Sequence, residues 1–486
     1  MNLKQKAFTG LLWSIIQYSG SQVFSLIIFL VLARLLTPET FGLIALANVF
    51  LAFMQIFRQQ GFSKALIQRE NIEPEHLDAA FWSQAIFGIL LMGITYFAAG
   101  LVAGIFTQPK LIPILQTLSL IFIINSFSHV HNAILEREFA FKVIAMRSLM
   151  ATIISGIVGV SMAFAGYGIW SLVTLNIMVE LVSLIVMWTA VDWRPRLRFS
   201  VKHFQDLFGF GMQVLAFKFI KFFDKRADNL LIGYFLGEVA LGYYAIAYRI
   251  LEVMTQLLVK TTNKVALPTF SRLQTEPERF RQLFYNTTQF TSIIAFPTYL
   301  GVIVFAPELI ITLFGEQWIP AIGAMRILSL EGIILSLSLI YKSVFISMGK
   351  PSWTVRISLL NATANLVACL IAVRWGIVAV ATGYVISSYL VFPVNQWEVN
   401  QLIKINSMNY IKQFITPVAS TGIMVVTILT VKHFLSDALN SPFLIVVGTL
   451  IGILIYASCI KIFEPQLYKQ LWSFLRSVTS NKKQTA

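Results

Sequence analysis

Fourteen apolar stretches, each long enough to cross a membrane as a helix, constrain what this chain can fold into. A bilayer core requires roughly 20 helical residues, because backbone groups inside it find no water to bind. The sequence predicts helices at 8–33, 41–58, 78–105, 111–135, 142–166, 168–190, 205–235, 239–262, 284–314, 319–342, 352–373, 376–398, 409–432 and 441–461. The connections are too short to form a catalytic domain outside the membrane. The expected fold is therefore an all-α polytopic membrane protein.

The composition of the 486 residues agrees with this interpretation. Hydrophobic residues make up 57% of the chain and charged residues 12%, about half the charged fraction of ordinary soluble domains. Cys369 and Cys459 lie singly in apolar stretches, which gives neither a disulfide framework nor a cluster of metal ligands. We therefore expect no metal, no cofactor and no catalytic residues.

The distribution of Lys and Arg predicts the orientation in the membrane, because positively charged loops stay on the cytoplasmic side. Basic residues gather at both ends and in every second loop, whereas the alternate loops carry only Arg34, Lys110, Arg374 and Lys432. Both termini are therefore expected in the cytoplasm. These basic loops also account for the net charge of +15 without a nucleic-acid partner, and they favour membrane lipids with anionic headgroups.

The chain also contains a weak internal repeat. Residues 31–50 align without gaps to residues 231–250, and Gly42/Gly242 is one of four identical pairs at an offset of 200 residues. The interval spans six predicted helices, an even number, so both copies have the same orientation in the membrane. The repeat predicts one six-helix bundle over 1–200, a second over 201–400, and two further helices with a basic tail over 401–486.

Four stretches carry a family resemblance: WSIIQYSGSQVFSLIIFLVLARLLTPETFGLIALA (Trp13–Ala47), RQQGFSKALIQRE (Arg58–Glu70), LEREFAFK (Leu135–Lys142) and ADNLLIGYFLG (Ala227–Gly237). They resemble Wzx-type polysaccharide flippases of the multidrug/oligosaccharidyl-lipid/polysaccharide exporter superfamily, and the colanic-acid exporter branch in particular. The resemblance implies a V-shaped pair of bundles in the bacterial inner membrane. It also implies a transporter that moves an undecaprenyl-diphosphate-linked oligosaccharide from the cytoplasmic to the periplasmic leaflet by alternating access. Other polysaccharide-assembly proteins are candidate partners.

Charge inside the membrane is concentrated in the seventh predicted helix. An ionised side chain at mid-membrane costs about 2.5–3.5 kcal/mol and therefore requires water, a partner or a ligand. At about 100° per residue, five polar residues share one face of this helix. They are Lys218, Lys221, Lys225, Asp228 and Asn229.

Two interpretations of this face remain open. In the first, Lys221 pairs with Asp224 and Lys225 with Asp228, and the remaining side chains extend toward the cytoplasm. In the second, the face lines a water-filled lumen and binds the diphosphate of a lipid-linked sugar. Lys218 lies near the predicted midplane, which favours the lumen.

Other charged residues within helices are weaker candidates. Arg249 and Arg326 are candidate substrate contacts, although Arg249 has Glu252 and Arg326 has Glu331 as a nearby partner. Glu180 has no evident partner on its own helix and is a candidate protonation site. Glu180, Glu331 and Asp228 are therefore the candidate residues for coupling to H⁺ or Na⁺.

Three other functions are compared with the flippase. A membrane glycosyltransferase or polymerase usually has an acidic metal motif or a large periplasmic loop, and the sequence has neither. An ATP-driven exporter requires a phosphate-binding Gly-x-x-x-x-Gly-Lys-Ser/Thr loop, which is absent. An ion-coupled multidrug or cation antiporter of the same superfamily usually has twelve helices and an acidic site. The sequence therefore favours a transporter of an anionic cargo over an enzyme.

Overall fold

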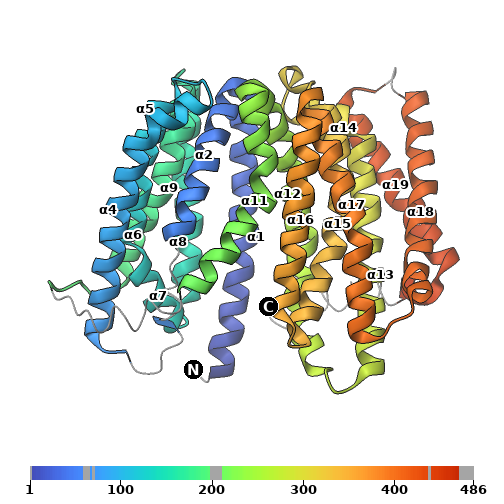
Figure 1. The fold of residues 1–486 in the computed structure, drawn as a ribbon. Coiled ribbons are helices and arrows are strands. Elements are labelled where there is room, and N and C mark those ends of the chain that lie inside the picture. The colour runs from blue at the N-terminus through green and yellow to red at the C-terminus, as the bar shows by residue number, and fades with distance from the viewer. Residues whose placement is uncertain (1–2, 59–65, 68–71, 198–210, 436–438, 470–486) are drawn as a thin grey trace. The chain divides into compact units, whose positions relative to one another are not determined.

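The computed structural model describes residues 3–58, 66–67, 72–197, 211–435 and 439–469. All regular secondary structure among these residues is helical (Figure 1). The chain divides into two compact units, Met1–Ala245 and Ile246–Ala486. Helices follow the apolar stretches because an apolar segment in a bilayer must pair its backbone groups within the chain.

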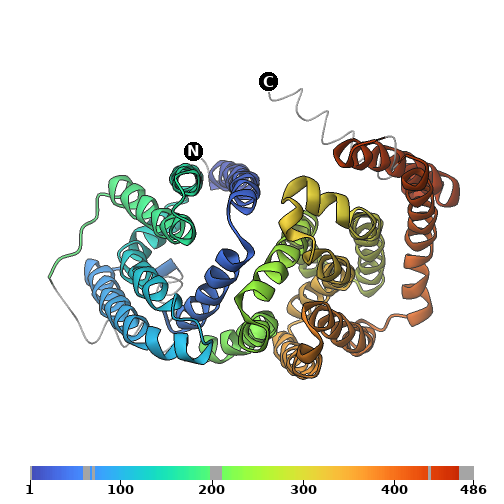
Figure 2. The ribbon, with the colours of Figure 1, turned by 90° about the horizontal axis from the view of Figure 1, so that it is seen from above.

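The first unit contains nine helices among the described residues. They are α1 (Leu3–Leu35), α2 (Pro38–Arg58), α4 (Pro74–Ile105), α5 (Leu111–Leu118), α6 (Leu120–Ser126), α7 (His129–Arg137), α8 (Phe141–Phe164), α9 (Ile169–Ala190) and α11 (Gly211–Phe235). In this unit α8 packs against α1 and α9, α4 against α5 and α6, and α11 against α2. Figure 2 shows these helices end-on. The long helix α12 (Gly237–Arg272) begins in the first unit and continues in the second.

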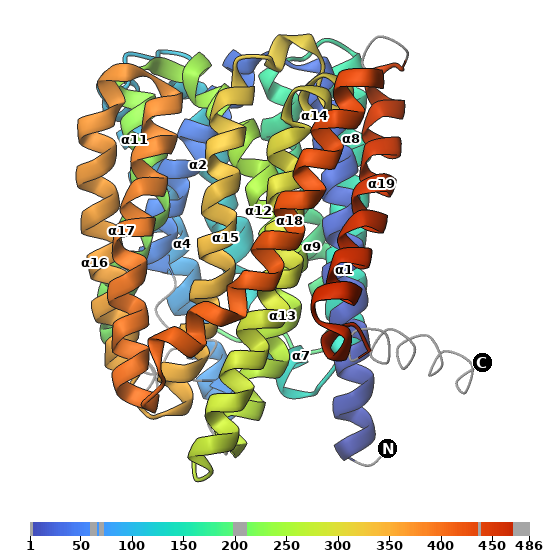
Figure 3. The same cartoon turned by 90° about the vertical axis from the view of Figure 1, so that its right-hand side faces the viewer.

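The second unit is built from the remaining helices. They are α13 (Pro277–Val304), α14 (Ala306–Leu313), η1 (Glu316–Trp318), α15 (Ala321–Ser347), α16 (Pro351–Ala372), η2 (Val373–Trp375), α17 (Ile377–Ile403), α18 (Ser407–Leu435) and α19 (Ser441–Phe463). Helix α15 packs against α13 and α17, and α16 packs against α17. Helices α18 and α19 form a pair on one side of this unit, where α18 packs along α13 (Figure 3).

An ion pair attaches this terminal helix pair to the rest of the second unit. Lys432 Nζ on α18 lies 2.8 Å from Glu308 Oε1 on α14 and also donates to the Val304 carbonyl oxygen at 2.8 Å. The same amine lies 5.7 Å from the centre of the Phe305 ring. On α19, a Cβ atom at Gly448 would stand 2.5 Å from that ring, so the ring packs directly on the helix backbone. The contacts combine charge neutralisation with close packing at one point.

The structure confirms the all-α membrane fold expected from the sequence. Each of the fourteen predicted segments coincides with one or more helices among the described residues. Eleven helices in the described part of the chain are long and apolar enough to cross a membrane, as judged by length and composition. The predicted segment 111–135 is divided into α5, α6 and α7, and 284–314 into α13 and α14. Pro307 explains the second break, because proline lacks a backbone donor and clashes with the preceding turn. Helix α12 runs ten residues past its predicted end at 262.

Candidate functional site

The predicted basic face lies on α11, where its lysines differ in exposure. Lys218 and Lys221 are half-buried, and Lys225 is exposed. Lys221 Nζ lies 2.8 Å from Asp224 Oδ2, which confirms the local pair considered from the sequence. The side chain of Lys221 is 35% exposed in spite of this pair, so its ammonium group stays accessible. At least one lysine of this face is therefore neutralised locally, and none of the three is fully buried.

Asp228 and Asn229 lie deeper than the lysines on the same helix. They are 2% and 5% exposed. Tyr244 on α12 donates its hydroxyl to Asp228 Oδ2 at 2.8 Å, and the Asn229 backbone N–H donates to Oδ1 at 2.7 Å. Asp228 thus links α11 to the start of α12. Its predicted role in ion coupling stays a prediction.

Phenylalanines join α11 to α2 on the flank of the basic face. The Phe53 ring on α2 lies 5.8 Å from Phe219 and 5.5 Å from Phe222, centre to centre, with both pairs in edge-on geometry. Such edge-on pairs stabilise a contact beyond the area that they bury. The packing fixes α11 against α2, the helix that ends at Arg58.

A cavity of about 380 Å³ opens among α1, α6, α7 and α8 of the first unit. Its lining is rich in side chains that can exchange hydrogen bonds. The polar lining residues are Ser14, Gln17, Asn125, Ser128, His129, Asn132, Glu136 and Arg147. Such a cavity, with convergent polar and charged groups, is a natural candidate for a binding site.

Two arginines enter the hydrogen bonds around this cavity from different helices. Arg58 Nη1 lies 3.1 Å from His129 Nε2, and Arg147 Nη1 donates to Asn132 Oδ1 at 3.1 Å. Asn132 in turn donates to Glu136 Oε1 at 2.7 Å. The Nε atoms of Arg58 and Arg147 are buried without a hydrogen-bond partner in the described part of the chain. Each guanidinium is therefore incompletely hydrogen-bonded, and its charge favours an anion nearby, which arginine binds in a forked geometry.

Glu180 on α9 faces the same arginines. Its carboxylate accepts a hydrogen bond from Asn125 and is attracted by the positive charges of Arg58 and Arg147. The sequence indicated no partner for Glu180 on its own helix, and the partners in fact come from α2, α6 and α8. The site thus contains two acidic side chains, Glu136 and Glu180, and two basic ones, Arg58 and Arg147.

Sequence reasoning missed the two arginines as site residues because it counted them only as inner-loop charges. Arg58 is the last residue of α2, and Arg147 lies within α8. Their position inside or at the end of an apolar helix was the available signal. No pattern along the sequence brings residues 58, 147 and 180 together, since they lie on three helices.

The remaining predicted residues lie in the second unit. Arg249 Nη1 on α12 binds Glu252 Oε2 at 2.8 Å, the partner expected from the sequence. Arg326 is exposed near the start of α15, and Glu331 is 3% exposed on the same helix. Their predicted roles in substrate binding and ion coupling stay predictions.

The comparisons with known proteins agree with the fold and the predicted class. The model of the family described as "Polysaccharide biosynthesis protein" matches residues 31–323. The chain is 24% identical over 449 residues to the teichuronic acid biosynthesis protein TuaB of Bacillus subtilis. This match covers 90% of this chain and 92% of the relative. It is 26% identical over 342 residues to the lipopolysaccharide biosynthesis protein WzxC of Escherichia coli, with 69% of each chain covered.

A solved structure with a similar fold is that of the lipid II flippase MurJ in an inward closed conformation. The TM-score is 0.77 at 16% sequence identity, and the match covers 94% of this chain and 99% of that chain. At this identity the similarity establishes the fold alone. The fold of 94% of the chain thus follows a known architecture.

Proposed function

Because this chain belongs to the polysaccharide biosynthesis protein family, we propose that it is a flippase for an undecaprenyl-diphosphate-linked oligosaccharide. The resemblance to Wzx-type flippases of the multidrug/oligosaccharidyl-lipid/polysaccharide exporter superfamily is confirmed by the family and by the fold. The chain is a multi-pass membrane protein, and its relatives are transporters. The proposed movement is from the cytoplasmic to the periplasmic leaflet of the bacterial inner membrane by alternating access, with both termini in the cytoplasm.

The observation that carries the proposed substrate is a pair of arginines in the first unit, Arg147 in the lining of the cavity and Arg58 hydrogen-bonded to the lining residue His129. A diphosphate is a compact, doubly charged anion, and guanidinium groups bind it with forked, charge-assisted hydrogen bonds. Arg58 and Arg147 each keep a buried Nε donor unused in the described structure. The lysines of α11, half-buried or exposed, are further cationic groups of the first unit that can bind phosphate as point charges. Together these groups favour an anionic headgroup over a neutral sugar as the recognised feature.

Glu180 gives this site a resident negative charge. In the absence of a ligand its carboxylate partly neutralises Arg58 and Arg147, and an arriving diphosphate competes with it for them. We propose that uptake of H⁺ by Glu180 favours cargo binding. Glu331 and Asp228 are the other proposed sites of coupling to H⁺ or Na⁺, since both are buried carboxylates.

The alternative function is an ion-coupled multidrug or cation antiporter of the same superfamily. Glu180 is the observation that favours it, because a carboxylate at a cavity can bind a cation. The two arginines disfavour it, since they repel a cation at the same place. A membrane glycosyltransferase or polymerase is the third function considered, and the described residues contain no cluster of three or more His, Cys, Asp or Glu that could hold a metal ion.

We further propose the bundles and partners expected from the sequence. The bundles are proposed to span 1–200 and 201–400, with an additional helix pair and tail over 401–486. The partners are the lipid-linked oligosaccharide, membrane lipids and other polysaccharide-assembly proteins.

The test uses a deletion strain that is complemented with single variants. Arg58→Gln and Arg147→Gln should each strongly reduce surface glycan and leave the lipid-linked intermediate inside the cell, at unchanged protein level. Arg374→Gln is the matched control, because Arg374 is exposed and lies in the second unit. Full export by the Arg58→Gln/Arg147→Gln double variant would contradict the proposed site. Normal surface glycan in the deletion strain itself would contradict the proposed function.

A further inference from the structure

The starts of α2 and α12 make an unusually close backbone contact within the first unit. A Cβ atom at Gly42 would stand 1.7 Å from the Glu238 carbonyl oxygen, and a Cβ at Gly242 would stand 2.0 Å from the Pro38 carbonyl oxygen. Neither obstacle is a flexible side chain, so no larger residue fits without moving a helix. At this point each helix therefore places a glycine against the backbone of the other.

This contact matches the 200-residue offset of the predicted repeat. Gly42 meets Glu238 and Gly242 meets Pro38, and the numbers of both partners differ by the 200 residues that relate 31–50 to 231–250. The contact thus has local two-fold symmetry between the matching segments of the two halves. In the predicted orientation it lies at the outer surface, because α2 and α12 both begin there.

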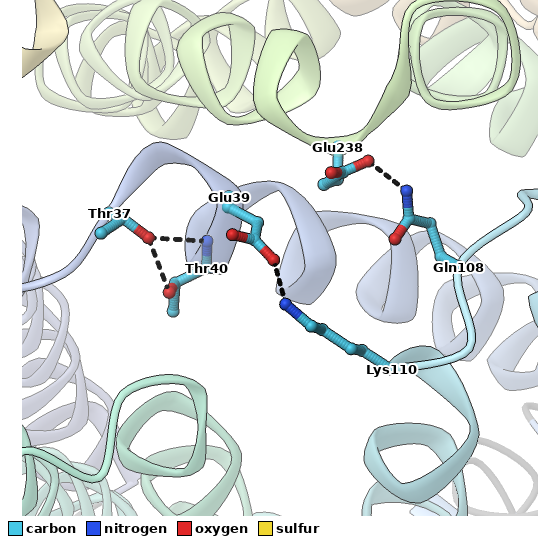
Figure 4. Close-up of polar contacts among 6 residues, drawn as sticks. All are labelled: Thr37, Glu39, Thr40, Gln108, Lys110 and Glu238. Atoms are coloured by element: carbon cyan, nitrogen blue, oxygen red, sulfur yellow. Dashed lines mark hydrogen bonds and ion pairs between the residues drawn. The ribbon is translucent and has the colours of Figure 1, made fainter.

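A short segment between α4 and α5 connects the same two helices. In the segment Thr107–Lys110, Lys110 Nζ donates to Glu39 Oε1 on α2 at 2.5 Å (Figure 4). Gln108 Nε2 donates to the carboxylate of Glu238 on α12 (Figure 4). One segment of the chain therefore binds an acidic side chain at the start of each helix.

The backbone of this segment is held in a conformation that its own sequence disfavours. Thr107 has φ +54°, in the left-handed region that is costly for a β-branched residue. The contacts of Gln108 and Lys110 follow directly on this residue. Strained backbone of this kind persists only where the surroundings hold it, and it is common in segments that move.

We propose that the segment Thr107–Lys110 is a clasp that holds the starts of α2 and α12 together and that opens during the transport cycle. The inference rests on the proposed function, since only a transporter requires these helix ends to part. The contacts suit a reversible device. Lys110 and Glu39 are 68% and 41% exposed, and ion pairs this exposed are weak. Glu39 raises the pKa of Lys110 by accepting its hydrogen bond, so the amine stays charged under physiological conditions.

Leu46 provides a reporter position beneath the clasp. It is 1% exposed, and its side chain packs on Gly233 of α11. A cysteine at this position should be protected from a membrane-impermeant maleimide while the helix starts are held together. The native Cys369 and Cys459 are both buried, and the chain without the added cysteine gives the background.

The experiment measures the labelling rate of Leu46→Cys from outside intact spheroplasts. Glu238→Ala should raise the rate about two- to tenfold, the population shift expected from the loss of one hydrogen bond. Lys110→Ala should raise it less, because the ion pair that it removes is exposed and weak. Glu238→Gln should keep the slow rate, because its amide oxygen still accepts from Gln108. Glu316→Ala, at an exposed acid in the second unit, should also leave the rate unchanged.

Two outcomes would overturn the clasp. One is an unchanged rate in the Glu238→Ala/Lys110→Ala double variant, and the other is an equal rise in Glu316→Ala. The assay requires no cargo, so its result is independent of whether the chain moves a lipid-linked oligosaccharide. If the clasp variants change labelling as expected but the chain supports no glycan export, the proposed function is contradicted and the clasp is not.

Discussion

Gly242 lies so close to Gly42 that a Cβ atom on Gly242 would stand 3.2 Å from the Gly42 amide nitrogen. The nearest obstacles at both positions are carbonyl oxygens of the facing helix, which cannot rotate away as a side chain can. Helix pairs in membranes often use small residues in this way, because close backbone approach increases dispersion contacts.

The first prediction follows from this packing. Gly42→Ala and Gly242→Ala should each destabilise the protein by about 1–3 kcal/mol, the usual cost of overpacking, and should impair export. Gly93→Ala is the matched control, because Gly93 lies within α4 with open space around the position of a Cβ. The thermal aggregation midpoint in detergent measures the difference. Equal midpoints for Gly42→Ala and Gly93→Ala would contradict the close contact.

The second prediction concerns the lysines of α11. Replacement of Lys218, Lys221 and Lys225 together by Gln should abolish glycan export at unchanged protein level, because three positive charges proposed to attract the diphosphate are lost. A control triple variant at Lys350, Lys404 and Lys412 removes the same charge from exposed positions in the second unit and should export normally. Surface glycan measures both. Full export by the α11 variant would exclude phosphate contact by these lysines.

The third prediction concerns the attachment of the terminal helix pair. Lys432→Met should lower the free energy of unfolding by about 3–5 kcal/mol, because it leaves the carboxylate of Glu308 buried without its cation. The double variant Lys432→Met/Glu308→Leu should regain most of the loss. Lys461→Met, at an exposed lysine of α19, should have little effect. A double variant no more stable than Lys432→Met would show that the pair acts through shape instead of charge.

The fourth prediction tests the orientation. Single cysteines at Thr37, Tyr167 and Glu316 should react with an impermeant reagent added outside, whereas a cysteine at Gln274 should stay unlabelled until the membrane is opened. All four positions are exposed, so access to the side chain does not limit the reaction. Gln68, a further predicted inner position, lies outside the described residues. Labelling of Gln274→Cys alone would reverse the predicted topology.

The sequence predicted the helices well because apolarity over about 20 residues is a local property. It was wrong where the end of a helix depends on more than apolarity. The polar extension of α12 to Arg272 and the break before Pro307 are two such cases. It identified the lysines of α11 from their spacing, but the burial of Asp228 depends on Tyr244, and nothing in the spacing along α11 indicates that contact.

The candidate site could be predicted only in part, for a similar reason. Glu180 was singled out because a lone carboxylate in an apolar helix requires compensation. Its compensation comes from Arg58 and Arg147, whose positions are fixed by the packing of three helices. Of these two residues, which look like loop charges in the sequence, Arg147 lines the cavity and Arg58 is hydrogen-bonded to its lining residue His129.

The size of the cavity limits what it can recognise. A volume of about 380 Å³ corresponds to roughly a dozen water molecules at about 30 Å³ each. That is the scale of a diphosphate with its first sugar, and a repeat unit of several sugars exceeds it. Under the proposed function, the cavity binds the diphosphate linkage that all such cargos share and does not discriminate the order of the outer sugars. A protein with this cavity would then transport glycans that differ in the sugars beyond the first one.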